Sequence, residues 1–149
     1  MRRWVGSIAV VALGLVALGA APGLASGFMG SDAPSRIPVP ARVFSATFED
    51  VGGVEVTGRR VTFDGEVFVH GRLGEGQVTV PFEQIQELRF EPAEQSNRRI
   101  AVIQLRSEKD PVRIVIKDDA PWFARARFGN YKIESRDLRL VHRFELQEG

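Results

Sequence analysis

The side chains capable of catalysis are few and form no known catalytic motif. His70 and His142 are the only imidazoles among the 149 residues, and neither has a second histidine or a carboxylate at ligand-like spacing. The serines lack the Gly-x-Ser-x-Gly and Ser-x-x-Lys arrangements of serine nucleophiles. Gly74-Glu75-Gly76 is followed by no predicted helix, which a phosphate-binding loop requires. The sequence therefore predicts no catalytic residue, no metal site and no cofactor, and both histidines are expected to be structural or exposed.

The most distinctive local feature is the segment from Trp122 to Phe128, which combines aromatic residues, arginines and alanines. Aromatic rings beside arginines can stack on a sugar or contact anionic groups. Trp122, Phe123, Arg125 and Arg127 are therefore candidate contacts for a ligand or partner. The same segment also fits an amphipathic strand, with Trp122, the alanines and Phe128 on the buried face. In that interpretation Phe123 lies on the outer face with the two arginines and remains a candidate contact.

These residues must be positioned by β-strands, and the best-patterned stretch is Gly76–Phe90. Its first part alternates apolar and polar residues with the period of a half-buried strand. Pro81 has no N–H to donate, so it should close that strand or lie at an edge. One turn follows, and the chain then re-enters a strand with Leu88 and Phe90 inward.

The rest of the chain repeats this β pattern. Short apolar runs recur at spacings of about 8–12 residues with no competing helical period. Asp64-Gly65 is the strongest hairpin signal, and residues 100–105 and 112–116 form a second hairpin pattern. We therefore expect an all-β protein, a small antiparallel barrel or sandwich of about eight to eleven strands.

The pattern of Gly76–Phe90 occurs again, shifted by 53 residues, at Gly129–Phe144. The terminal aromatic is displaced by one position, and Ser135 stands where the first copy has Phe82. The second copy should therefore pack less tightly at that corner. Either an internal duplication or the shared pattern of amphipathic strands explains the match.

The expected organisation is a signal peptide, a lead-in and two β modules. The signal peptide spans residues 1–25, the extended lead-in 26–42, the first module 43–91, a polar linker 92–99, and the second module 100–146.

The N-terminus has the layout of a secretory signal. Arg2 and Arg3 precede an apolar run that ends at Pro22-Gly23, with cleavage expected after Ala25 or Gly27. The run is also long enough for an uncleaved membrane anchor. Cleavage is the favoured interpretation, and it places the protein in the periplasm or outside the cell.

The amino-acid composition excludes further kinds of chemistry and some classes of partner. The chain has no cysteine, which excludes disulfides, thiol catalysis and a lipoprotein anchor. Removing Arg2 and Arg3 from the 20 basic residues leaves a net charge of −1 against 19 acidic residues, so nucleic acid is not an expected partner. Residues 28–97 carry a net charge of −5 and residues 98–149 one of +4. The halves either complement each other or provide a basic face for an anionic envelope partner.

Three segments support a resemblance: Ser35–Pro40, Asp64-Gly65 and Val78–Ile85. They resemble a group of small exported bacterial proteins that are uncharacterised, so the resemblance implies no functional residue. The strand–turn–strand pattern is also similar to Sm-like small barrels. This likeness concerns architecture, and export argues against the RNA-binding role of those barrels.

The leading functional hypothesis is a non-enzymatic exported module, structural or interacting, that binds a protein or polymer of the cell envelope. The alternative is an envelope enzyme whose site is assembled between the halves from His70, His142 and loop acids. A cleft holding both histidines near carboxylates would favour the enzyme. A third hypothesis is a membrane-tethered accessory protein, which requires an uncleaved N-terminus.

Overall fold

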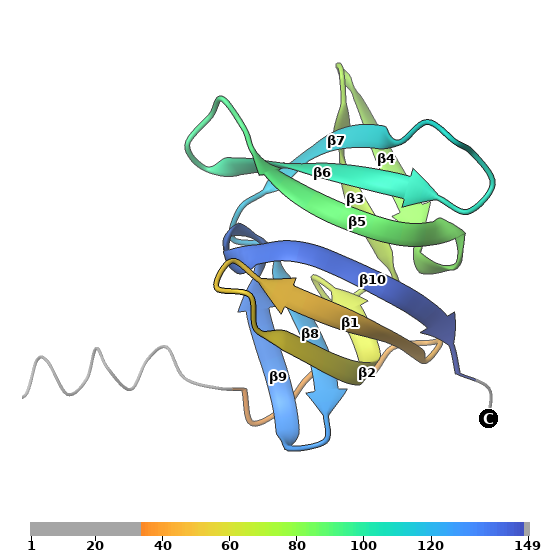
Figure 1. Cartoon of the computed structure of the whole chain (residues 1–149), viewed down its shortest axis with the longest axis vertical. Helices are drawn as coiled ribbons and strands as arrows, with labels where there is room; N and C mark the ends of the chain where they lie inside the picture. The colour runs from red at the N-terminus through yellow and green to blue at the C-terminus, as the bar shows by residue number, and fades with distance from the viewer. Residues whose placement is uncertain (1–33, 148–149) are drawn as a thin grey trace, which may run out of the picture. The chain divides into compact units, whose positions relative to one another are not determined.

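The computed structural model describes residues 34–147, which form one ten-stranded antiparallel sheet curled into a half-barrel (Figure 1). The strands are β1 (Phe44–Asp50), β2 (Glu55–Phe63), β3 (Phe68–Leu73), β4 (Gly76–Pro81), β5 (Ile85–Pro92), β6 (Arg98–Leu105), β7 (Val112–Lys117), β8 (Pro121–Ala126), β9 (Gly129–Glu134) and β10 (Leu138–Leu146). Two short 3₁₀ turns, η2 (Phe82–Gln84) and η3 (Ser135–Asp137), complete the elements. The all-β, antiparallel prediction is confirmed. The predicted signal peptide and residues 26–33 of the predicted lead-in lie outside the described residues.

The strand order shows that the two halves of the chain exchange strands. It runs β4-β3-β7-β6-β5-β10-β1-β2-β8-β9. The first-half hairpin β3–β4 therefore extends the second-half hairpin β6–β7, while β8–β9 extends β1–β2. Figure 1 shows the two resulting groups, with β3 to β7 in one and β1, β2 and β8 to β10 in the other. The pairing of β5 with β10 joins them.

The elements of the two halves recur with the same 53-residue offset as the sequence pattern. β8, β9 and η3 begin and end 53 residues after β3, β4 and η2, and β10 begins 53 residues after β5. The strands β1 to β5 correspond in order to β6 to β10. When each strand in the observed order is replaced by its counterpart in the other half, the same order results, read in reverse. The arrangement of elements is thus repeated, while a duplication of the sequence stays a prediction.

A β-bulge accounts for the one-residue displacement between Phe90 and Phe144. The pairing of β1 with β10 shifts register between Ser45 and Thr47, and Arg143 of β10 has a φ of 59°. A bulge inserts one extra residue into one strand and reverses which face the following side chains occupy. As a result Phe144 returns to the buried face, where it is 1% exposed.

The turn at Asp64-Gly65 forms as predicted. Asp64 has a φ of 52° and Gly65 one of 86°, and Phe63 exchanges two backbone hydrogen bonds with Glu66. Positive φ at both central residues matches the twist of antiparallel strands, and Asp and Gly adopt it readily.

The predicted linker, residues 92–99, is part of a hairpin within the sheet. Pro92 ends β5 and pairs with Arg99 of β6, while Arg98 pairs with Lys117 of β7. Only residues 93–97 lie outside strands. The chain therefore turns back on itself here because both flanking segments stay extended and pair with each other.

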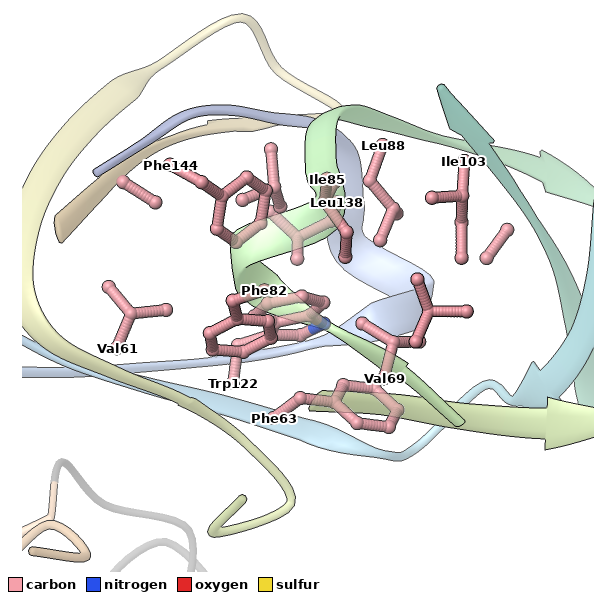
Figure 2. Packing of buried hydrophobic residues seen from close by; sticks show 14 of the residues in the cluster. Val61, Phe63, Val69, Phe82, Ile85, Leu88, Ile103, Trp122, Leu138 and Phe144 are labelled. Atoms are coloured by element: carbon pink, nitrogen blue, oxygen red, sulfur yellow. The ribbon is translucent and has the colours of Figure 1, made fainter. Parts of the chain in front are cut away.

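Trp122 lies at the centre of the core (Figure 2). Its ring stacks on Phe82 at a centroid distance of 5.9 Å and meets Phe63 edge-on at 5.0 Å. Phe48, Phe90 and Phe144 also contact it. A residue from the second half of the chain thus packs against aromatic rings that come mainly from the first half.

The core corner at Ser135 is held by hydrogen bonds. Trp122 Nε1 donates to Ser135 Oγ at 3.2 Å, and Ser135 Oγ donates to the Ala120 carbonyl at 2.8 Å. Ser135 is fully buried. Ser135, which stands 53 residues after Phe82, therefore supplies the polar partner that a buried indole N–H requires.

We predict that Trp122→Ala lowers the free energy of unfolding by about 3–5 kcal/mol, the usual cost of removing a large aromatic from a core. Urea denaturation of purified protein measures this change. The control is Phe128→Ala, because Phe128 is 64% exposed and its loss should cost within about 0.5 kcal/mol. Equal effects of the two substitutions would contradict the central position of Trp122.

Candidate functional site

The predicted contact residues divide between core and surface. Trp122 is fully buried, which corrects its assignment as a contact, because the indole cannot reach a partner in the folded chain. Phe123 and Arg125 lie on the outer face of β8, the first half-buried and the second exposed. Arg127 and Phe128 are exposed beyond the end of β8. Phe128 does not join the buried face as predicted, because the strand ends at Ala126 and the chain turns.

The outer side of β2, β8 and β9 carries a group of basic residues, here called the basic face: Arg59, Arg60, Arg125, Arg127 and Lys132. All five side chains are exposed. Arg59 of β2 stands directly opposite Arg125 of β8. Like charges at directly opposite positions destabilise a sheet. The basic face thus contains a repulsive pair at the junction between the exchanged strands.

The lead-in contacts elements at both ends of β8. Asn130 Nδ2 donates to the carbonyls of Pro34 and Ser35 at 3.3 and 3.2 Å. A methyl group added at Gly65 would lie 3.9 Å from Pro38. Half-buried Phe123 lies between these points along the strand, so the cations are the more accessible part of this surface.

The structure also reveals a pocket that the sequence analysis did not predict. β3 and β7 pair at a single position, Arg72 opposite Val115, and separate on either side of it. The pocket at this β3–β7 junction has a volume of about 440 Å³. Its polar lining includes Asp64, His70, Arg72, Thr79, Arg98 and Lys117. These residues come from both halves of the chain.

His70 and Asp64 lie side by side in this pocket. The distance from His70 Nε2 to Asp64 Oδ2 is 3.5 Å. The Phe63 ring meets the imidazole edge-on at a centroid distance of 5.1 Å. Asp64 belongs to the tight turn after β2, and His70 lies on β3, so the turn geometry brings the carboxylate to the imidazole.

Three cations line the same pocket. Arg98 of β6 is directly opposite Lys117 of β7, which forms a second like-charge pair. Arg72 lies 3.4 Å from Glu75, but both side chains are exposed, so this ion pair contributes little. The positive charges therefore outnumber the single carboxylate of Asp64 in the lining.

The equivalent position in the other half of the chain carries a larger side chain. Tyr131 of β9 occupies the place that Val78 has in β4, and its ring lies 5.5 Å from Phe48. β2 and β8 also pair at four positions, where β3 and β7 pair at one. The β3–β7 junction thus has a smaller side chain and fewer strand pairs than its counterpart.

The structure does not bring the two histidines together. His142 lies on β10 opposite Thr47 and Glu87, and it does not line the pocket that contains His70. Within residues 34–147 no group of three potential metal-ligating side chains occurs. The same residues contain no helix long and apolar enough to span a membrane. The pocket that contains His70 is therefore not the cleft with both histidines that would favour the enzyme hypothesis.

Comparison of the chain with protein-family models, curated proteins and solved structures finds no match.

Tyr131 has a pKa raised to about 12, first because burial disfavours the phenolate and then because Asp50 and Asp137 repel it. The unfolded chain has a tyrosine pKa of about 10. Between about pH 10 and 12 the unfolded chain therefore loses this proton before the folded chain does, and the free energy of unfolding falls as pH rises.

We predict that alkaline absorbance titration of the folded protein gives a midpoint near 12. The signal is unambiguous because Tyr131 is the only tyrosine. Tyr131→Phe should remove the corresponding part of the pH dependence of unfolding. A midpoint near 10 would show that the ring is not desolvated against β1.

Proposed function

We propose that this protein is a non-enzymatic, exported interaction module that binds an anionic polymer of the cell envelope through the basic face. The observation that carries the proposal is the position of Arg59 directly opposite Arg125 across β2 and β8. This repulsion weakens the free sheet. A polymer that places negative charges over the two side chains would relieve it, so binding gains free energy from a feature that is unfavourable in the free protein.

The pairing pattern of the other arginines separates the basic face from an ordinary solvated surface. Elsewhere on the sheet, Arg113 pairs with Glu91, Arg136 with Glu134 and Arg139 with Glu49. Within residues 34–147, no carboxylate lies within 4.0 Å of a basic-face cation. The cations of the basic face are thus available to an external anion.

The distribution of charge favours a polymer over a compact protein partner. The five cations extend from β2 across β8 to β9. A chain with repeated negative charges can contact several of them at once, although each exposed contact is weak. A protein partner with an acidic surface is the second candidate, and salt sensitivity is expected of both.

The location of the protein rests on the N-terminal sequence. Arg2, Arg3 and the apolar run that follows support export, with the mature protein in the periplasm or outside the cell. Membrane attachment follows only if this segment is retained. The 53-residue recurrence of elements supports an origin by tandem duplication. Different side chains on the two copies then account for a basic face on only one of them.

We predict that the protein binds dextran sulfate but not neutral dextran at low ionic strength. The double variant Arg59→Gln with Arg125→Gln should bind about tenfold more weakly, which corresponds to about 1.4 kcal/mol. Isothermal titration calorimetry at several salt concentrations measures both effects.

The matched control is Arg113→Gln with Arg89→Gln, which removes two exposed arginines from the other group of strands. This control should change affinity less than about twofold, because its arginines already have acidic partners. Equal losses in both double variants would mean that net charge, and not the basic face, determines binding. No binding of dextran sulfate, together with capture of an acidic protein by the same arginines, would replace the polymer with the second candidate.

A further inference from the structure

We infer that the pocket at the β3–β7 junction is a binding site for a small molecule that carries an oxyanion, a carboxylate or a phosphate, on an apolar body. The site is separate from the basic face and does not depend on the polymer-binding proposal. Its lining combines cations with apolar side chains in a volume of about 440 Å³. A volume of this size is typical of small-molecule sites.

The cations indicate an anionic ligand. Arg98 and Lys117 stand directly opposite each other on β6 and β7, and both line the pocket. No carboxylate lies within 4.0 Å of either in the part of the chain that the structure describes. Their repulsion is therefore not compensated inside the protein, and a bound oxyanion between them would offset it. Arg72 on β3 adds a third positive charge to the same lining.

Asp64 and His70 also line the pocket. Asp64 lies 3.5 Å from His70 and is the single carboxylate of the lining. The carboxylate disfavours an anion at its own end of the pocket. The oxyanion is thus expected at Arg98 and Lys117, with the remainder of the ligand against the apolar part of the lining.

The apolar side chains of the lining indicate that the part of the ligand outside the oxyanion is apolar. Phe63, Val78 and Ile116 line the pocket along with the charged groups. A free inorganic anion would leave this surface in contact with water, whereas a ring or short hydrocarbon attached to the anion would cover it. The combination of an apolar wall and a few polar groups that fix orientation is the usual composition of ligand pockets.

The other half of the chain differs from the pocket at the equivalent position. There Tyr131 occupies the place of Val78, and β2 and β8 pair at four positions where β3 and β7 pair at one. Gly71 allows β3 to approach β7 closely, because a Cβ at this position would lie 2.6 Å from the Val115 carbonyl. Val78 lines the pocket with a smaller side chain than the tyrosine at the equivalent position.

The test is a titration of the ¹⁵N-labelled mature chain, as isolated, with benzoate, phenyl phosphate and benzyl alcohol. The two anions should shift the amide signals of Gly71, Thr79 and Lys117 with dissociation constants in the millimolar range or below. Stronger binding of benzoate assigns a carboxylate, and stronger binding of phenyl phosphate assigns a phosphate. Benzyl alcohol has the same ring without the charge and should bind at least about tenfold more weakly, because it cannot make the charge-assisted hydrogen bonds.

Two kinds of variant test the residues. The double variant Arg98→Gln with Lys117→Gln should weaken anion binding about tenfold or more. The control Arg113→Gln, on the same strand as Lys117, should change the affinity less than about twofold. Val78→Tyr keeps every charge and introduces the larger residue found at the equivalent position of the other half, so it should abolish binding while the spectrum remains that of a folded protein.

Three results would overturn the inference. They are the absence of shifts with either anion, equal affinity for benzyl alcohol, and unchanged binding in both the double variant and Val78→Tyr. The basic-face variant Arg59→Gln with Arg125→Gln should leave anion binding in the pocket unchanged. A result that contradicts the pocket proposal can thereby be distinguished from one that contradicts the basic-face proposal.

Discussion

The structure depends on one buried contact, the packing of Trp122 against Phe82. The two rings stack at 5.9 Å, and the indole N–H donates to Ser135 in the second 3₁₀ turn. Trp122 belongs to a strand that leaves its own half of the chain and pairs with β2. The ring therefore fixes β8 against the first half, and the exchange of hairpins follows from this contact as much as from backbone pairing. Loss of the ring would remove the apolar contact that holds the exchanged strand in place.

The local features of the fold could be predicted from the sequence. Period-two alternation located the strands of Gly76–Phe90, and Asp64-Gly65 identified a two-residue turn because few residue pairs accept positive φ at both positions. The exchange of strands could not be predicted, because each hairpin has the same alternation whichever neighbour it pairs with. Trp122 is buried with Ala124 and Ala126, as the amphipathic-strand interpretation predicts, and this burial corrects the alternative assignment of Trp122 as a contact.

Only part of the candidate sites could be predicted from the sequence. The arginines of Trp122–Phe128 were identified by composition, but their partner Arg59 lies on a strand that only the exchange brings beside them. The pocket could not be predicted in this way, because the predicted hairpin of residues 100–105 and 112–116 does not fix the register that places Arg98 opposite Lys117. The rest of the pocket depends on β3, which reaches β7 through the exchange. Both sites therefore lie at junctions between strands from different halves of the chain.

The exchange of strands is thus the central claim, and engineered disulfides test it most directly. The chain has no cysteine, so each introduced pair is the only one present. Arg72 faces Val115 across β3 and β7, and facing residues in an antiparallel pair have Cα atoms about 4.5–5.5 Å apart, within the range that a disulfide spans.

In an unexchanged fold, β3 would pair with β2 as β8 does, and Arg72 would face Arg59. Mild oxidation of dilute protein, followed by mass spectrometry, compares the two arrangements. The exchanged fold predicts an intramolecular disulfide in Arg72→Cys with Val115→Cys, and none in Arg72→Cys with Arg59→Cys. The reverse result would show that each half of the chain keeps its own strands, and would contradict both proposed sites.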